Sequence, residues 1–290
     1  MRPTSQEVPA AMPIGLLVAG VGRSGTSLAT LMSLALGLRG PHVDDVMPPN
    51  DANPTGYWES NSLAILNDEL LAQWGSTWWT PPATIDDPMM RQLDGHTEKA
   101  LSAFRSAFGS APRWIWKDPR LTVLLDFWLQ LLGPQPILVP VRSPQAVAHS
   151  ISARDRIGYP DALLIWERHT RSLLRQLHGH RVLLLDYQLL TRTPDQWIHT
   201  VRTFCQNAGL DVHDPTQVPK QQIARHRREL SGPLSDQQLE LAATVRQLHG
   251  AHVAFPHVEP GPETPTANTV QFDVERTARN SAPQASATTG

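Results

Sequence analysis

A glycine-rich turn near the start of the chain carries residue types that bind anions. Residues 14–28 read Ile-Gly-Leu-Leu-Val-Ala-Gly-Val-Gly-Arg-Ser-Gly-Thr-Ser-Leu, which predicts a buried strand, a turn and a helix. Glycines in such a turn let backbone N–H groups face an anion, and the start of the helix adds partial positive charge. The candidate phosphate-binding residues are Gly22, Arg23, Ser24, Gly25, Thr26 and Ser27.

This turn departs from the loop of nucleotide hydrolases, in which Gly-Lys-Ser/Thr follows a first glycine and four further residues. Gly20 and Gly25 fit that pattern, but Thr26 stands where the lysine would be. The loop should therefore hold one phosphate well and a triphosphate with Mg²⁺ poorly. An ATP-dependent P-loop kinase is the alternative enzyme, and a non-catalytic nucleotide-binding domain is the alternative outside catalysis.

A second group of anion-binding residues follows the apolar run 137–141. Arg142 ends this run, so it should lie at the carboxyl edge of a sheet, where open α/β folds bind ligands. Ser150 lies about two helical turns further on, and Arg154 follows at i+4 on the same face. A hydroxyl and guanidinium groups at this edge could bind a dianionic phosphate. For Arg142 and Arg154 an ordinary surface ion pair is the other interpretation.

Together these two motifs resemble the sulfotransferase family that uses 3′-phosphoadenosine 5′-phosphosulfate (PAPS). Its 5′-phosphosulfate loop, a basic residue followed by Ser-Gly-Thr-Ser/Thr, is matched by residues 23–27. Its 3′-phosphate motif, an arginine at a strand end and a serine on the next helix, is matched by Arg142 and Ser150. The resemblance covers roughly residues 14–210 and implies PAPS as sulfuryl donor, with no metal. Family members often carry a tryptophan against the adenine where this chain has Leu28.

The resemblance also implies roles in sulfuryl transfer, which depends mainly on positioning and charge stabilisation, by analogy with phosphoryl transfer. Arg23 would stabilise the oxygen that is left behind, acting electrostatically because a guanidinium stays protonated. The acceptor hydroxyl needs a base, for which Glu59 is the first candidate and Asp118 the second. Glu59 could instead favour a helix N-terminus, and Asp118 could cap a helix.

Other residues could extend this site. Lys117 and Arg120 could widen the positive pocket, whereas His149 has no predicted orientation. A basic run could supply further cations for the 3′-phosphate, but such a run is more often a solvated helix face, and we favour that interpretation here: Arg225, Arg227 and Arg228. Tryptophans gathered after a long loop could form an acceptor platform or pack in the core: Trp58, Trp74, Trp78 and Trp79.

The elements that must position these residues alternate along the chain. Four short apolar runs are typical of buried strands: 14–19, 113–116, 137–141 and 182–185. Each is followed by a segment in which apolar residues recur every three or four positions, which is typical of a helix. We expect an α/β, P-loop-like, three-layer fold with a central parallel sheet of about four or five strands flanked by helices. Ser143 and Asp118, each before a proline, should start helices, and Gly133 should end one. Residues 39–56 should form an open loop.

Length and composition limit the remaining possibilities. The 290 residues predict a leader at 1–12, one domain at 13–254 and a tail without regular structure at 255–290. A net charge of −2 argues against general nucleic-acid binding. The single cysteine, Cys205, and the lack of a signal segment or membrane span favour the cytoplasm. A small-molecule, saccharide or lipid acceptor is expected, and the oligomeric state is left open.

Overall fold

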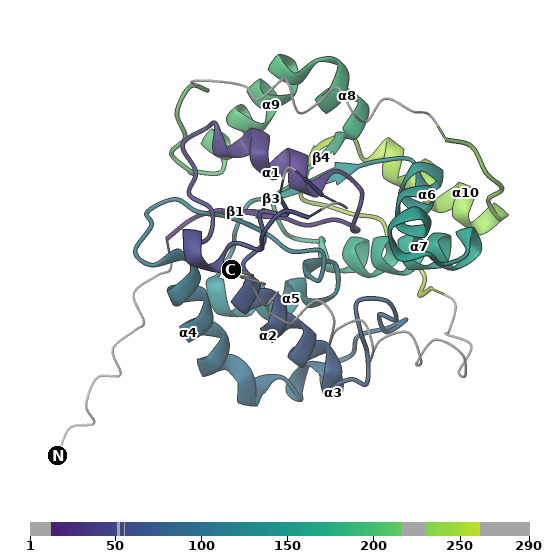
Figure 1. Cartoon of the computed structure of the whole chain (residues 1–290), viewed down its shortest axis with the longest axis horizontal. Coiled ribbons are helices and arrows are strands. Elements are labelled where there is room, and N and C mark those ends of the chain that lie inside the picture. Colours follow the sequence, from purple (N-terminus) through teal and green to yellow (C-terminus); the bar gives the residue numbers. More distant parts are fainter. Residues whose placement is uncertain (1–12, 51–52, 55, 216–229, 262–290) are drawn as a thin grey trace, which may run out of the picture.

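The computed structural model describes residues 13–50, 53–54, 56–215 and 230–261 (Figure 1). The strands are β1 (Leu16–Val18), β2 (Ile115–Lys117), β3 (Ile137–Val141), β4 (Val182–Asp186) and β5 (Gly250–His252). The helices are α1 (Thr26–Leu34), α2 (Asn61–Ala72), α3 (Asp87–Arg91), α4 (Thr97–Phe108), α5 (Leu121–Leu132), α6 (Pro144–Asp155), α7 (Tyr159–Gln176), α8 (Tyr187–Arg192), α9 (Pro194–Asn207) and α10 (Asp236–Gln247). Short 3-10 helices span Val43–Asp45 and Asp94–His96.

The strands form one sheet in the order β2-β1-β3-β4-β5. The pairs β1–β2, β1–β3 and β3–β4 are parallel, and β5 runs antiparallel to β4 at the edge. The predicted α/β class and central sheet are thus confirmed, and β5 is the one described strand that departs from the predicted parallel arrangement. Because β1 lies between β2 and β3, the residues that follow these three strands meet at one carboxyl edge.

Helices cover both faces of the sheet, which gives three layers (Figure 1). Side chains alternate along the strands: Leu17 faces the larger hydrophobic cluster, whereas Leu16 and Val18 face the smaller one. Helices α1, α8 and α9 supply the smaller cluster, and α2, α4, α5, α6, α7 and α10 contribute to the larger. Phe255 and Val258, past the expected domain end, are also buried in the larger cluster.

Several local predictions agree with the structure. The Ser143 side chain accepts a hydrogen bond from the Ala146 amide and caps α6. Helix α5 ends at Gly133, whose φ of 74° lies in the left-handed region. The run 137–141 coincides with β3.

Other local predictions are wrong in detail. Helix α5 begins at Leu121, three residues after Asp118, although the Asp118 carboxylate does accept a hydrogen bond from the Arg120 amide at 2.8 Å. The region 39–56 is not a simple open loop, since it contains the 3-10 helix Val43–Asp45. Strand β5 has only the sequence Gly-Ala-His, which carries no apolar signal.

Candidate active site

The turn between β1 and α1 has the backbone of an anion-binding loop. Arg23 has a φ of 71° and Gly25 a φ of 101°, so left-handed residues alternate with others in this turn. Such alternation directs successive N–H groups to one side, and the first-turn N–H groups of α1 follow at Thr26. A left-handed arginine is uncommon, and strained residues of this kind cluster at functional sites.

Two aromatic rings press against the glycines of this loop. A Cβ atom at Gly22 would lie 2.7 Å from the Trp78 ring, and one at Gly25 would lie 2.3 Å from the Tyr187 ring. Any larger residue would displace these rings, so glycine is required at both positions. Tyr187 was not singled out in the sequence, although its place directly after β4 puts it at the carboxyl edge of the sheet.

The Ser24 hydroxyl offers a test of whether the loop fits an anion. Its Oγ atom is buried and has no hydrogen-bond partner among the described residues. A buried polar atom without a hydrogen-bond partner lowers the stability of a fold by about 1–3 kcal/mol. A phosphate or sulfate oxygen would supply the missing acceptor, so the residues present fit such a group.

The two predicted anion motifs meet in the structure. The Arg23 Nε atom donates to the Ser150 Oγ atom at 3.0 Å, and Arg142 Nη1 donates to the Arg23 carbonyl at 3.0 Å. The Arg142 guanidinium also lies 5.0 Å from the centre of the Tyr187 ring. A helix and a strand end from the middle of the chain are thereby joined directly to the loop after β1.

Positive charge is concentrated around Arg23. Burial, followed by the nearby Arg154 guanidinium, lowers the pKa of Arg23, and Arg142 contributes in the same direction. Burial likewise lowers the pKa of Arg142. Guanidinium groups nevertheless stay protonated. Asp155 offsets part of this charge through its ion pair with Arg154 at 2.7 Å. A bound dianion would relieve the repulsion that remains.

Glu59 lies in a buried group of charged side chains. Its carboxylate pairs with the Lys117 ammonium, and Arg120 Nη1 lies 3.9 Å from Glu59 Oε2. Burial raises the pKa of the Glu59 carboxyl, while the Lys117 charge opposes that rise. A carboxylate with a raised pKa suits general-base chemistry. The predicted basic residues Lys117 and Arg120 therefore lie against this candidate base.

The hydrogen bonds of Asp118 indicate a structural role. Its side chain is fully buried and accepts from the Asn67 amide at 2.9 Å, the Arg120 backbone N–H at 2.8 Å and the Arg120 guanidinium at 3.2 Å. Both carboxylate oxygens are thus occupied. These contacts favour a structural role just before α5 over a role as base, although the residue that caps α5 is Arg120.

Among the tryptophans after the long loop, Trp78 lies directly against the loop. Its ring lies against Gly22 and packs on His169, with ring centres 4.5 Å apart. Arg154 lies over Trp78 and Trp79 at 5.9 and 5.7 Å from the ring centres. Both rings also pack against the hydrophobic core. The core packing of these two rings is therefore observed, whereas their role as a platform for the acceptor stays a prediction.

His169 is a buried residue that the sequence did not single out. Its Nε2 atom bonds the Trp78 carbonyl at 2.7 Å, and its Nδ1 atom lies 2.6 Å from the Thr122 hydroxyl. Burial lowers the pKa of His169 to about 4. The neutral ring therefore anchors the segment that carries Trp78. A histidine inside an otherwise amphipathic helix carries no sequence signal for such a contact.

Three remaining predicted groups lie away from the loop or outside the described residues. His149 Nε2 bonds the Ser231 carbonyl at 2.8 Å and its ring packs on Tyr159, so it faces the segment after residue 229. Leu28 is half-buried beside the smaller hydrophobic cluster. The basic run lies outside the described residues: Arg225, Arg227 and Arg228.

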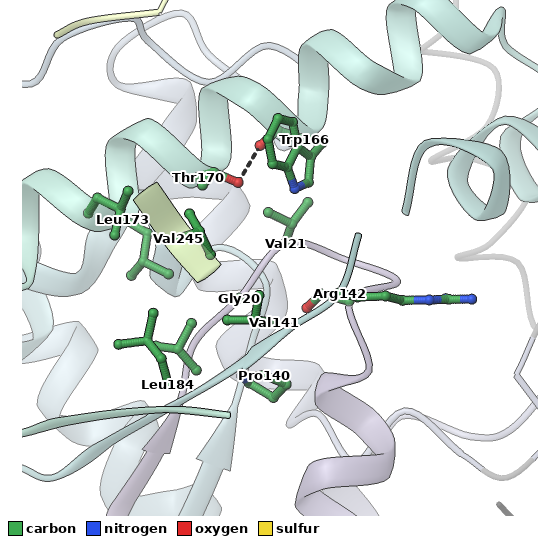
Figure 2. Close-up of a pocket in the computed structure, with 13 residues that line it drawn as sticks. Gly20, Val21, Pro140, Val141, Arg142, Trp166, Thr170, Leu173, Leu184 and Val245 are labelled. Carbon is green, nitrogen blue, oxygen red and sulfur yellow. Dashed lines mark hydrogen bonds between the residues drawn. The ribbon is translucent and has the colours of Figure 1, made fainter. Parts of the chain in front are cut away.

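A small apolar cavity lies behind the loop (Figure 2). Its volume is about 40 Å³, and Gly20, Val21 and Ser24 form part of its wall. Side chains of β3, β4, α7 and α10 complete the lining. The Arg142 side chain extends away from this cavity (Figure 2). Since ligand pockets measure roughly 300–1,000 Å³, a nucleotide would have to bind on the Arg142 side of the loop.

Within the described ranges, no cluster of three or more His, Cys, Asp or Glu side chains could hold a metal ion. No helix in the part of the chain that the structure describes has both the length and the apolar character to cross a bilayer.

No family model matches the chain, and no curated protein matches it. Solved structures do match. Three of them are sulfotransferases or sulfotransferase domains. The domain of the Synechococcus PCC 7002 olefin synthase is 19% identical, with a TM-score of 0.47, over 83% of this chain and 98% of that one. The sulfotransferase domain of the curacin biosynthetic pathway is 16% identical, with a TM-score of 0.46, over 82% of this chain and 99% of that one. A Mycobacterium avium sulfotransferase is 15% identical, with a TM-score of 0.42, over 83% of this chain and 75% of that one.

Proposed function

We propose that this chain is a sulfotransferase that moves the sulfuryl group of PAPS to a hydroxyl of a small-molecule, saccharide or lipid acceptor. One observation carries the proposal: the loop after β1, Arg142 and Ser150 converge on one another. A nucleotide with phosphate groups at both its 3′ and 5′ positions needs two adjacent anion sites. The loop and the Arg142–Ser150 pair offer them side by side.

Different residues would bind the two ends of the nucleotide. Loop N–H groups and the hydroxyls of Ser24 and Thr26 would hold the 5′ side, and Arg142 with Ser150 would hold the 3′-phosphate. The Ser150 hydroxyl accepts from Arg23 and can still donate its own hydrogen. It could thus serve the 3′-phosphate while it holds the Arg23 guanidinium in place.

PAPS, when bound, supplies an activated sulfuryl group. Arg23 would stabilise negative charge on the oxygen from which this group departs. Glu59 would accept the proton of the acceptor hydroxyl, and its burial beside Lys117 keeps water away from the carboxylate. Asp118 would hold Arg120 and the start of α5 in place.

The cytoplasm remains our proposed location, because the single cysteine is buried and unpaired. Burial raises the pKa of the Cys205 thiol to about 12, so the reactive thiolate is disfavoured.

The test is incubation of the purified chain with PAPS labelled in its sulfuryl group and an extract of the source cells, followed by mass analysis of the labelled products. Label in an acceptor, absent with Arg23→Ala, supports the proposal. ATP with Mg²⁺ in place of PAPS tests the kinase alternative. Binding of adenosine 3′,5′-bisphosphate without any sulfated product would indicate a non-catalytic nucleotide-binding domain.

A further inference from the structure

The segment that carries Glu59 is bonded directly to the helix that follows the phosphate loop. The Ser27 hydroxyl donates to the Tyr57 carbonyl at 3.3 Å. The Asn53 side-chain amide donates to the Ser27 hydroxyl at 3.4 Å and to the Gly56 carbonyl at 2.7 Å. Asn53 thus uses both hydrogens of its NH₂ group, one toward α1 and one within its own turn.

This contact braces an unusual backbone conformation next to Glu59. Trp58 has a φ of 60°, a strained conformation that is rare for a bulky residue. Both neighbouring carbonyls are fixed, that of Tyr57 by Ser27 and that of Glu59 by the Met47 amide at 2.8 Å. The strained backbone at Trp58 is therefore held from α1 on one side and from the 43–47 segment on the other.

A hydrogen-bonded turn precedes this segment, and the Asn53 side chain braces it. The Gly56 amide closes a turn on the Asn53 carbonyl at 3.0 Å, with Gly56 at a φ of 87°. After Trp58, the Glu59 side chain is buried in its ion pair with Lys117. Without the Asn53 amide, the Gly56 carbonyl and the Ser27 hydroxyl would each lose a donor, and the turn could relax.

We propose that Asn53 is a positioning residue that couples the phosphate-binding end of α1 to the Glu59 segment. The inference rests on the proposed function, since it assumes that the loop binds a nucleotide and that Glu59 serves the acceptor. Binding of an anion at the loop should tighten the first turn of α1, and Ser27 with Asn53 would pass that constraint to residues 56–60. Neither residue needs to touch the acceptor.

The experiment measures backbone hydrogen exchange of residues 56–60 with and without adenosine 3′,5′-bisphosphate. Wild type, Asn53→Ala, Asn53→Asp and Asn61→Ala are compared; Asn61 is exposed on α2 and serves as the control. Asp keeps the size of Asn but lacks the two donated hydrogens, so both Asn53 variants should behave alike. The unfolding midpoint and the bisphosphate affinity are measured for each protein.

We expect the bisphosphate to slow exchange at residues 56–60 in wild type and in Asn61→Ala by about fivefold or more. Both Asn53 variants should lose this response while binding the bisphosphate within about threefold of wild type. In the labelled-PAPS assay their kcat should fall about tenfold, with little change in KM for PAPS. A purely structural role would instead lower the unfolding midpoint and the affinity together.

The outcomes separate this inference from the proposed function. An unchanged exchange response in the Asn53 variants, or loss of the response only together with loss of stability, overturns the inference and leaves the proposed function intact. A wild-type chain that binds no bisphosphate contradicts the proposed function, and the positioning role of Asn53 falls with it.

Discussion

Arg23 and Ser150 are joined by a hydrogen bond of 3.0 Å, although 127 positions separate them in the chain. The bond links the loop after β1 to the middle of α6, so the two candidate phosphate sites share one hydroxyl. Arg142 adds a second link through the Arg23 carbonyl. A ligand that binds at one site should therefore affect the other. A substitution in either the loop or α6 should change both sites.

Replacement of Arg23 by alanine should reduce kcat far more than donor affinity. The guanidinium acts mainly where negative charge develops, so we expect a loss of about 10²–10³-fold in kcat. The affinity for adenosine 3′,5′-bisphosphate should weaken by no more than about tenfold, because the loop N–H groups remain. Calorimetric titration and the labelled-PAPS assay measure the two quantities. Equal turnover in Arg23→Ala would refute the role, and Arg23→Lys is the charge-retaining control.

Replacement of Arg142 by alanine should weaken recognition of the 3′-phosphate specifically. A charge-assisted contact at a partly buried site contributes about 1.5–3 kcal/mol, which is roughly a 10- to 150-fold change in affinity. Because Arg142 also bonds the Arg23 carbonyl, a general loosening of the loop must be distinguished. Adenosine 5′-phosphate, which lacks the 3′-phosphate, provides that control. If both nucleotides lose affinity equally, Arg142 does not bind the 3′-phosphate.

Parallel substitutions should separate the two candidate bases. Glu59→Gln should lower kcat by about 10²-fold or more while the fold survives. In wild type kcat should fall on the acidic side as Glu59 takes up a proton, and because burial raises the pKa of this carboxyl, that fall should begin at a higher pH than for an exposed glutamate. Full activity of Glu59→Gln at every pH would exclude Glu59 as the base.

Asp118→Asn should act on stability, because the Asp118 carboxylate accepts from Asn67 and twice from Arg120. An amide group at this position would place a donor against Asn67 or Arg120, and it would leave the Arg120 charge poorly balanced. We expect a loss of about 2–4 kcal/mol in the free energy of unfolding. Unchanged stability with lost activity would reverse the assignment and make Asp118 the base.

The fold and the outline of the site follow from the sequence for a clear physical reason. Buried parallel strands read as short apolar runs, so β3 and β4 are visible directly. Arg142 follows β3 at the edge where β1 also ends, and the chain order alone brings it near the loop. The outer strand β5 gives no such signal, because it is short, half-exposed and antiparallel.

The fine structure of the site depends on contacts that local patterns do not encode. Lys117 and Glu59 pair across 58 positions, a contact that arises only in the folded chain. Helix α1 is a similar case: its most buried face includes Thr26, Thr30 and Ser33 in addition to apolar residues. The Thr30 and Ser33 hydroxyls bond carbonyls one turn earlier, which makes their burial possible.

His169 should make the free energy of unfolding depend on pH. In the folded state its pKa is lowered to about 4, mainly by burial, whereas an exposed histidine titrates near 6.5. As the pH falls from about 6.5 to about 4, the unfolded chain binds a proton that the folded chain does not, so stability is lost in that window. At pH 5 the loss relative to pH 7.5 should be about 2 kcal/mol.

His169→Gln isolates this contribution. Glutamine can donate to the Trp78 carbonyl and accept from Thr122, the two partners of the imidazole, but it does not titrate. Burial raises the pKa of Asp126 to about 6, which stabilises the fold as the pH falls and so opposes His169; this effect is common to both proteins and cancels in the comparison. Urea unfolding at pH 7.5 and pH 5 should therefore show a smaller loss for His169→Gln, by about 2 kcal/mol. The same loss in both proteins would mean that the folded and unfolded chains protonate His169 alike, which would contradict a lowered pKa for the buried imidazole.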